Sequence, residues 1–404
     1  KKFVEKHPNF HIIATQNPLK GRFSQKRQFL SQKFRSLFQI INFVDITKEE
    51  LLEIAMGLSK NSSISTEVIE KLIDFHFEWK KIAEKENQIH VFTIREISGT
   101  IKSMKEGLPP YISILIHYGS RYDKEKLNEM IKVLNSFGFL PSDENLKLPP
   151  IDKDLFYMTH SIERAVLNSI HLLQTYHPIL VTGPDGCGKT SFARWISHIF
   201  NKITQNQNEV KSIETNEKTE QKEQTETTEE EERETNDQLE QKDETEQNET
   251  SKQDETSEQP QDKEKEENKS SSQTTNVFIC NPEVSISDII GRYMPVMGAV
   301  GEAPIMWVDG PVVRSLRNGD CLIMDQIDIA PSTILERMNP IYDSFGIKDA
   351  RFPVQENSEE DSIPIHPNAR IIATSSLEGL YEISPALLNR FTIIHIDDQL
   401  NQLF

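Results

Sequence analysis

Cysteine is scarce in this chain, and long apolar runs are missing. The three cysteines, Cys187, Cys280 and Cys321, are far apart and lack the spacing of metal ligands, which favours a reducing compartment over a disulfide scaffold. No apolar run approaches the roughly 18 residues of a transmembrane helix, and no signal-peptide pattern is present. Because the chain starts at Lys1 and stops at the apolar Phe404, we expect both ends to be internal positions of a longer protein.

Aromatic residues are absent from residues 203–275, where Glu, Gln, Thr, Lys and Asn predominate. Residues 201–270 contain 24 acidic and 10 basic side chains, so −14 of the chain's net charge of −19 is concentrated there. Such a stretch cannot bury enough apolar surface to offset the entropy of ordering, which predicts a disordered acidic insertion at 203–275. We interpret it as a tolerated loop insertion, with a docking arm for basic partners as the alternative.

Strands and helices alternate from residue 176 onward, which predicts an α/β fold with a mainly parallel sheet. The expected strands are PILVTG, NVFIC, DCLIMD, ARIIATS and FTIIHI. The preceding part of the chain has apolar residues at helical spacing. Thr47 with Glu50, and Thr93 with Glu96, have the spacing of capping boxes at helix starts. Residues 47–145 are therefore expected to form a helical domain.

A repeat links the two ends of the chain. HIIATQNP begins at His11 and RIIATSSL at Arg370; LSQKFRSLFQIINFVDI begins at Leu30 and ISPALLNRFTIIHIDD at Ile383. Each copy predicts a strand, a loop, a helix and a second strand. Two copies of one unit indicate two modules of one fold.

A phosphate-binding motif follows the first expected strand of the second module. The sequence GPDGCGKT has the spacing GxxxxGKT and stands between a strand and a helix, which is the context this motif requires. Backbone N–H groups and the helix N-terminus would hold the phosphates of ATP, Lys189 would reach the β and γ phosphates, and the Thr190 hydroxyl would bind Mg²⁺. Cys187 could be a reactive thiol, although the motif accepts any residue there. The predicted nucleotide-binding residues are Gly183, Pro184, Asp185, Gly186, Cys187, Gly188, Lys189, Thr190 and Ser191.

A second magnesium ligand is expected on a neighbouring strand. The buried strand Cys321–Asp325 ends in a carboxylate, so Asp325 is predicted to bind Mg²⁺ together with Thr190. The next residue is Gln326, whose amide can orient a water molecule but cannot take its proton. Asp328 is a possible but poorly placed substitute.

With these motifs the chain resembles the midasins, a family of very large AAA+ proteins that remodel nuclear precursors of the large ribosomal subunit. The segments that carry the resemblance are NPEVSISDIIGRYMPV, the stretch from WVDGP to NPIYD, ATQNP and FTIREI. The resemblance implies a three-layer P-loop AAA+ fold with a helical lid domain and tandem modules. It divides the chain into the end of a first AAA+ core (1–46), its lid (47–145), and a second AAA+ core (150–404) with the insertion inside it.

Four residues receive catalytic roles through this resemblance. Asn17 would be sensor 1 and Arg95 sensor 2 of the first module, while Arg390 in LLNRF would be an arginine finger that serves the preceding module's nucleotide. Gln326 occupies the water-activating position. Ser376 replaces the expected sensor Asn, and the first copy has Leu37 at the finger position. Alternatively, Arg390 is an ordinary salt-bridge residue and Arg95 only part of a helix start.

The implied function is an ATP hydrolase of the AAA+ class, with ATP and Mg²⁺ as cofactors, acting in maturation and nuclear export of pre-60S ribosomal particles. Its partners would be that particle, its assembly factors and neighbouring modules in a ring, in the nucleus, without a membrane or sequence-specific nucleic-acid contact. The second module is expected to bind ATP and hydrolyse it weakly or not at all. Alternatives are another large AAA+ motor, dynein-like or with an adhesion-type domain, and a structural nucleotide holder.

Overall fold

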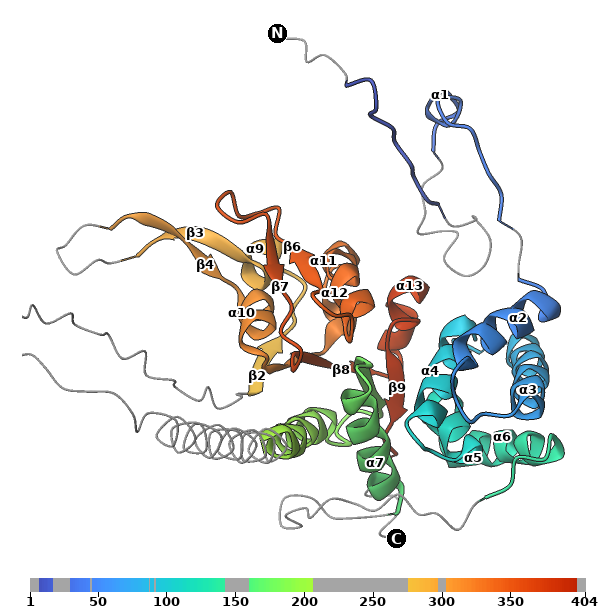
Figure 1. The fold of residues 1–404 in the computed structure, drawn as a ribbon. Coiled ribbons are helices and arrows are strands. Elements are labelled where there is room, and N and C mark those ends of the chain that lie inside the picture. Colours follow the sequence, from blue (N-terminus) through green and yellow to red (C-terminus); the bar gives the residue numbers. More distant parts are fainter. Residues whose placement is uncertain are drawn as a thin grey trace, which may run out of the picture.

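The computed structural model describes residues 7–16, 30–43, 46–86, 88–90, 92–141, 160–205, 275–296 and 303–397 (Figure 1). A helical domain comes first in the chain and an α/β core follows it. The helical domain lies beside the end of the core that carries β9 (Thr392–His395) and α13 (Pro385–Leu388). No helix in the described part is long and apolar enough to cross a bilayer.

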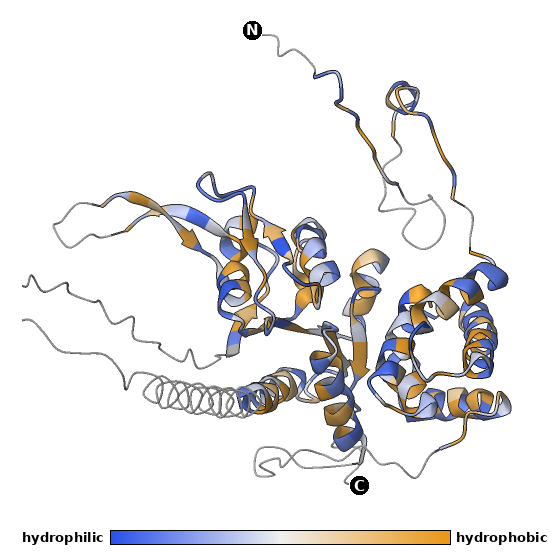
Figure 2. Ribbon diagram, viewed as in Figure 1, coloured by the Kyte–Doolittle hydropathy of each residue, from blue (hydrophilic) through white to orange (hydrophobic). Residues whose placement is uncertain are grey.

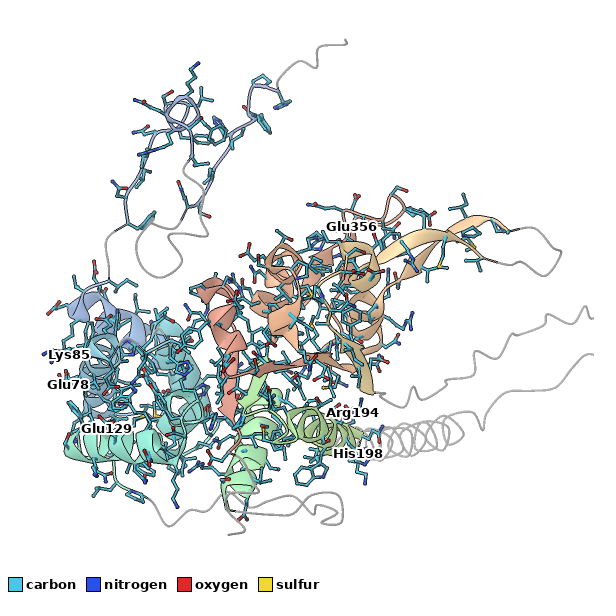
Figure 3. The ribbon with its side chains drawn as sticks, turned by 180° about the vertical axis from the view of Figure 1, so that it is seen from behind. Glu78, Lys85, Glu129, Arg194, His198 and Glu356 are labelled. Carbon is cyan, nitrogen blue, oxygen red and sulfur yellow. The ribbon has the colours of Figure 1, made fainter. Side chains whose placement is uncertain are left out.

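The described residues of the helical domain, 46–86, 88–90 and 92–141, form five α-helices and one π-helical turn. They are α2 (Lys48–Ser59), α3 (Thr66–Lys85), α4 (Ile94–Lys105), α5 (Pro110–Ile114), η2 (Leu115–Gly119) and α6 (Lys124–Ser136). Both expected capping boxes form, at the starts of α2 and α4. Large buried side chains fill the space between the helices: Phe75, Trp79, Phe92 and Tyr118. The exposed side chains of Glu78, Lys85 and Glu129 lie on the flank away from the core (Figure 3).

The core is built on a five-stranded sheet with the order β2-β5-β8-β1-β9. All four strand pairings are parallel. Besides β9, the strands are β1 (Ile179–Gly183), β2 (Thr275–Ile279), β5 (Cys321–Asp325) and β8 (Arg370–Ser376). These are the five strands expected from the sequence, and the predicted parallel α/β sheet is confirmed.

Helices cover both faces of this sheet, so the core has three layers. One face packs against α7 (His160–Gln174) and the helix at 189–205, the other against α10 (Pro311–Asn318), α11 (Ser332–Arg337) and α12 (Asn339–Ser344). Successive strand residues alternate between the two faces: Ile179 and Val181 contact the first layer and Leu180 the second. Hydrophobic residues accordingly concentrate on the strands and inner helix faces (Figure 2), whereas Arg194 and His198 are on the exposed side of helix 189–205 (Figure 3).

Two strand pairs were not expected from the sequence. An antiparallel hairpin of β3 (Gly291–Pro295) and β4 (Ile305–Asp309) projects from the core beyond the short helix α9 (Ile286–Ile289) (Figure 1). A second antiparallel pair joins β6 (Arg351–Pro353) to β7 (Ser362–Pro364). The first pair follows α9 and the second follows α12. In both places the pattern of apolar residues did not distinguish a strand from the neighbouring helix.

The boundaries of the predicted acidic insertion need correction by a few residues at each end. The helix that begins at Lys189 continues to residue 205, because Ile203 still packs against the core. At the other end Thr275 already belongs to β2, since it pairs with Cys321. The intervening residues 206–274 lie outside the described residues.

The first copy of the repeat does not form the expected strands. Residues 11–16 and 38–43 have no strand structure. In the described stretches 7–16 and 30–43, the one helix is α1 (Gln32–Arg35). Ile13 is 92% exposed and Phe43 is 94% exposed. A strand needs a hydrogen-bonded neighbour, and all five strands of the main sheet come from the second module. The described residues of this segment thus form one short helix and no strand, and the assignment of 1–46 to a first core stays a prediction.

A cluster of histidines joins the helical domain to the core. The Ser103 hydroxyl of α4 lies 2.8 Å from His117 Nε2 and 2.9 Å from His171 Nε2 of α7. His117 also packs against His177, with ring centroids 5.1 Å apart. Burial lowers the pKa of His171 to about 4 and that of His177 to about 3, and it lowers the pKa of His117 well below its ordinary value. The seam is therefore packed with neutral imidazoles at pH 7.

This cluster predicts that the chain loses stability on mild acidification. In the unfolded chain a histidine has a pKa near 6.5, so below that pH the unfolded state binds more protons than the folded one. The stabilising effect of neutral His171 and His177 is fully present above pH 6.5 and is lost as the pH falls towards 4. Each group contributes a slope of at most about 1.4 kcal/mol per pH unit.

Denaturant unfolding at pH 7 and pH 5 tests this expectation. His171→Gln keeps a polar partner for Ser103 but removes one titrating group, so this variant should lose less stability between the two pH values than the parent. His7→Gln, in an exposed turn, is the control. An equal loss in all three proteins would contradict the prediction.

Candidate functional site

The loop after β1 has the backbone of a phosphate-binding loop. Gly186 and Gly188 have positive φ angles of 82° and 89°, which residues with a side chain adopt only under strain. Gly183 ends β1, and a Cβ there would stand 2.4 Å from the Ile396 carbonyl oxygen. Cys187 is buried in the core, which opposes its reading as a reactive thiol, since reactive cysteines are partly exposed.

The side chain of Lys189 folds back over its own loop. Its Nζ donates to the carbonyl oxygens of Gly183 (3.1 Å) and Pro184 (2.9 Å) and lies 3.6 Å from Asp185 Oδ1. Three oxygens of one loop thus hold the ammonium group at the N-terminus of the following helix. An anion in the loop would replace weak carbonyl partners by charged ones, which make stronger hydrogen bonds.

The carboxylate of Asp325 connects three elements of the core. Its Oδ1 accepts one hydrogen bond from the Thr190 hydroxyl (2.8 Å) and another from the Thr374 hydroxyl of β8 (2.6 Å). Thr374 in turn accepts a hydrogen bond from the backbone N–H of Gln326 (2.9 Å). Thr374 is fully buried, so its hydroxyl has the fixed position that this arrangement needs.

The position after Asp325 has an unusual backbone. Gln326 has φ 58° and ψ 56°, the left-handed region, and its side chain is exposed. Ser376, at the expected sensor position, donates to Asp328 Oδ2 (3.0 Å) and accepts from the Gly379 N–H (2.9 Å). Asp328 is thus bound at the end of β8, and a Cβ at Gly379 would come within 2.0 Å of its Oδ2.

A second group of charged residues lies at the seam between α4 and the core. It lines a cavity of about 250 Å³, called here the seam cavity, whose charged walls are Arg95, Glu96, Lys102, Arg121, Asp343 and Arg390. Arg390 donates to both carboxylate oxygens of Asp343 at 2.7–3.1 Å. Arg95 Nη2 stands 3.6 Å from Asp343 Oδ1. No residue of the Gly183–Thr190 loop lines this cavity.

The structure therefore brings the predicted site residues together in two places. Residues of the loop, Thr190, Asp325, Gln326 and Ser376 meet at the carboxyl edge of the sheet, since Gly183 is paired with Ser376 and β5 is next to β8. Arg95 and Arg390 meet in the seam cavity. Asn17 lies outside the described residues, and Ser191 is an exposed residue of helix 189–205.

Sequence reasoning missed Thr374 and Asp343. Thr374 is the first polar residue after the apolar run Ile371–Ala373 in the strand RIIATSS, and that change was the available signal. Asp343 ends the segment NPIYD, and nothing in its spacing indicates that it meets two arginines from distant parts of the chain.

Comparison with known proteins covers both parts of the structure. Residues 268–391 match the AAA domain (dynein-related subfamily), a segment that includes Asp325, Gln326 and Arg390 but begins after the loop at Gly183. An uncharacterized protein of Staphylococcus aureus (strain USA300) is 28% identical over 120 residues, which cover 29% of this chain and 43% of that protein.

Two midasins align over almost all of the sequence. The midasin of Dictyostelium discoideum is 22% identical over 445 residues, and that of Giardia intestinalis is 23% identical over 433 residues. Each alignment covers 97% of this chain but only 7% and 8% of the respective midasin, so the chain spans less than a tenth of their length. Residues 268–391 thus match an AAA domain of the dynein-related subfamily, and the chain is similar to midasins over nearly its whole length.

Proposed function

We propose that the core is an ATP-binding AAA+ module that holds MgATP at the carboxyl edge of its sheet. The observation that carries the proposal is the hydrogen bond between Thr190 and Asp325, because it joins the hydroxyl of the phosphate loop to the carboxylate that ends β5, two strands away from β1. Membership of the AAA class supports it at the level of the family.

The residues present fit magnesium and a triphosphate. A hydroxyl and a carboxylate are oxygen ligands, and Mg²⁺ commonly takes only one or two carboxylates together with substrate phosphates. Thr190 and Asp325 would hold the ion, which would neutralise charge on the phosphates. The glycine backbone, with Gly186 and Gly188 in left-handed conformations, and Lys189 would bind the phosphates themselves.

Hydrolysis at this site is proposed to be slow or absent. Gln326 cannot accept a proton from water, and Ser376 is occupied by Asp328 and Gly379. Losing a positioned base costs roughly 10²–10⁴-fold in rate, while binding contacts remain. The module would then serve as a nucleotide holder within a larger machine.

The seam cavity is proposed to serve the nucleotide of a preceding module. Arg95 on α4 and Arg390 after α13 converge there from two domains, and the phosphate loop of this module does not reach it. Guanidinium groups match phosphate geometry, so Arg95 and Arg390 are suited to sensing a γ-phosphate between modules.

For the whole protein we propose an ATP-driven remodelling machine of the midasin type, acting on pre-60S ribosomal particles and their assembly factors in the nucleus. Similarity to two midasins along 97% of the chain supports this reading. The alternatives are another large AAA+ motor or a purely structural ring. Cryo-electron microscopy of the full-length protein bound to large-subunit precursors would test the choice, and failure to co-purify with such particles would argue against it.

Thr374→Val is predicted to weaken MgATP binding about 10-fold, because a hydrogen bond to a charged group contributes about 1.5–3 kcal/mol. Calorimetric titration of this chain with ATP, with and without Mg²⁺, measures the effect. ATP without Mg²⁺ should bind both proteins within about twofold, since Thr374 positions the Asp325 carboxylate and not the phosphate loop.

Thr374→Ser is the matched control, because it keeps the hydroxyl and should bind MgATP like the parent. Lys189→Ala should lose ATP binding with or without magnesium. If Thr374→Val loses affinity equally in both conditions, the hydroxyl supports the fold in general and not the ion.

In the full-length protein, this site is predicted to retain ATP through many turnovers of the other sites. Gln326→Glu should accelerate its single-turnover hydrolysis at least about 10-fold by supplying the missing base. Asp328→Asn should have no effect on the parent rate. Brisk hydrolysis by the parent that disappears in Asp328→Asn would show that Asp328 activates water and that the site is not silent.

A further inference from the structure

Asp343, at the end of α12, is the anion between the two arginines of the seam cavity. We propose that this carboxylate is a built-in substitute for a phosphate group: it holds Arg390 and Arg95 while the cavity is without a ligand, and a polyphosphate has to displace it. The inference rests on the proposed use of the cavity by the nucleotide of a preceding module.

Asp343 and Arg390 form a bidentate ion pair. Arg390 Nε lies 3.1 Å and 3.0 Å from the two carboxylate oxygens, and Nη2 lies 2.7 Å from Oδ2. The remaining nitrogen, Nη1, donates to the Ala386 carbonyl at 2.7 Å. Every nitrogen of the guanidinium group is therefore engaged, and the side that would meet a phosphate is the side that Asp343 occupies, because carboxylate and phosphate bind the same fork of donors.

Arg95 reaches the same carboxylate from the other domain. Its Nη2 stands 3.6 Å from Oδ1, an ion pair without a close hydrogen bond. Arg95 is in the first turn of α4, whereas Asp343 and Arg390 belong to the core. Asp343 consequently ties the helical domain to the core at the mouth of the cavity, and its displacement would release Arg95 from that tie.

The other carboxylate of the cavity is already committed elsewhere. Glu96 accepts from Arg121 through Oε1 (3.1 Å) and caps α4 through Oε2, which accepts from the Thr93 N–H (2.7 Å). Both Glu96 and Arg121 are buried, so this pair is fixed. Asp343 is instead 45% exposed, and among the described residues its carboxylate contacts only the two arginines.

These differences make Asp343 the exchangeable anion. The Asp343 side chain is 45% exposed, so water can solvate its carboxylate once it leaves the arginines, which the buried Glu96 could not gain. A polyphosphate also has more charge and more acceptor oxygens than a carboxylate. With Asp343 displaced, Arg95, Lys102 and Arg390 would all face the incoming anion. Because a polyphosphate has to displace Asp343, this carboxylate lowers the affinity of the seam cavity for polyphosphates.

The test uses this chain with Lys189→Ala in every sample, so that the phosphate loop does not bind the probe. Tripolyphosphate is titrated calorimetrically into this parent, Asp343→Asn, Arg390→Ala and the double variant. Asp343→Asn keeps the shape of the side chain and removes its charge, and should bind tripolyphosphate about 3- to 10-fold more tightly. Arg390→Ala should weaken binding and should abolish the gain in the double variant.

Asp349→Asn is the charge-matched control. Asp349 is exposed, six residues away, with φ 56°, a conformation that Asn tolerates, and this variant should bind like the parent. A merely structural Asp343 would give weaker binding on substitution, the opposite direction.

The outcomes separate the two proposals. If Arg390→Ala weakens binding but Asp343→Asn does not tighten it, the cavity takes polyphosphates and Asp343 is only a brace, so the present inference is wrong. If neither the parent nor Asp343→Asn binds tripolyphosphate through Arg390, the proposed use of the seam cavity is overturned together with it.

Discussion

Two hydroxyl groups donate to one oxygen of Asp325, and the candidate nucleotide site is arranged around that carboxylate. The arrangement exists because β1, β8 and β5 are neighbours and parallel, so their carboxyl ends meet at one edge. Thr190 lies in the first turn of the helix after β1, Thr374 belongs to β8, and Asp325 ends β5. A shift of one residue in the pairing of β5 with β8 would place Thr374 and Asp325 on opposite faces of the sheet, so that they no longer meet.

The contact between the helical domain and the core, by contrast, is made largely by hydrogen bonds. It is closed by polar groups: Ser120 Oγ donates to the Ile393 carbonyl, the His395 N–H donates to the Ser120 carbonyl, and Lys102 Nζ donates to the Thr175 carbonyl. Neutral histidines fill the interior of this contact. Directional contacts of this kind have fewer alternative arrangements than an apolar interface, so they specify how α4 stands against the core.

Sequence reasoning succeeded where local pattern and packing agree. The five parallel strands were predictable because each is a short apolar run bounded by turns, and both capping boxes at Thr47 and Thr93 were predictable because their contacts lie within four residues. The loop at Gly183 was predictable from the GxxxxGKT spacing and from its place between an expected strand and an expected helix. The roles given to Arg95, Arg390 and Gln326 stay predictions.

What failed depends on contacts between distant residues. Asp343 contacts Arg390, which is 47 residues away in the sequence, and Arg95, which belongs to the other domain. The periodicity of apolar residues cannot predict contacts of this kind. The described residues of the first repeat copy have the apolar strand pattern but form no strand, because a strand also needs a hydrogen-bonded neighbour, which the pattern alone does not supply. The hairpin β3–β4 was missed because it interrupts a helical segment.

The exposed segment at 38–43 has a consequence for the behaviour of this chain in solution. FQIINF contains six residues without a charge, and Ile40, Ile41 and Phe43 are all largely exposed. Short uncharged runs of this composition stack readily into intermolecular cross-β contacts when nothing covers them. At high concentration the isolated polypeptide should therefore self-associate through residues 38–43 while the helical domain and the core remain folded. A charged residue substituted into this segment would reduce the self-association.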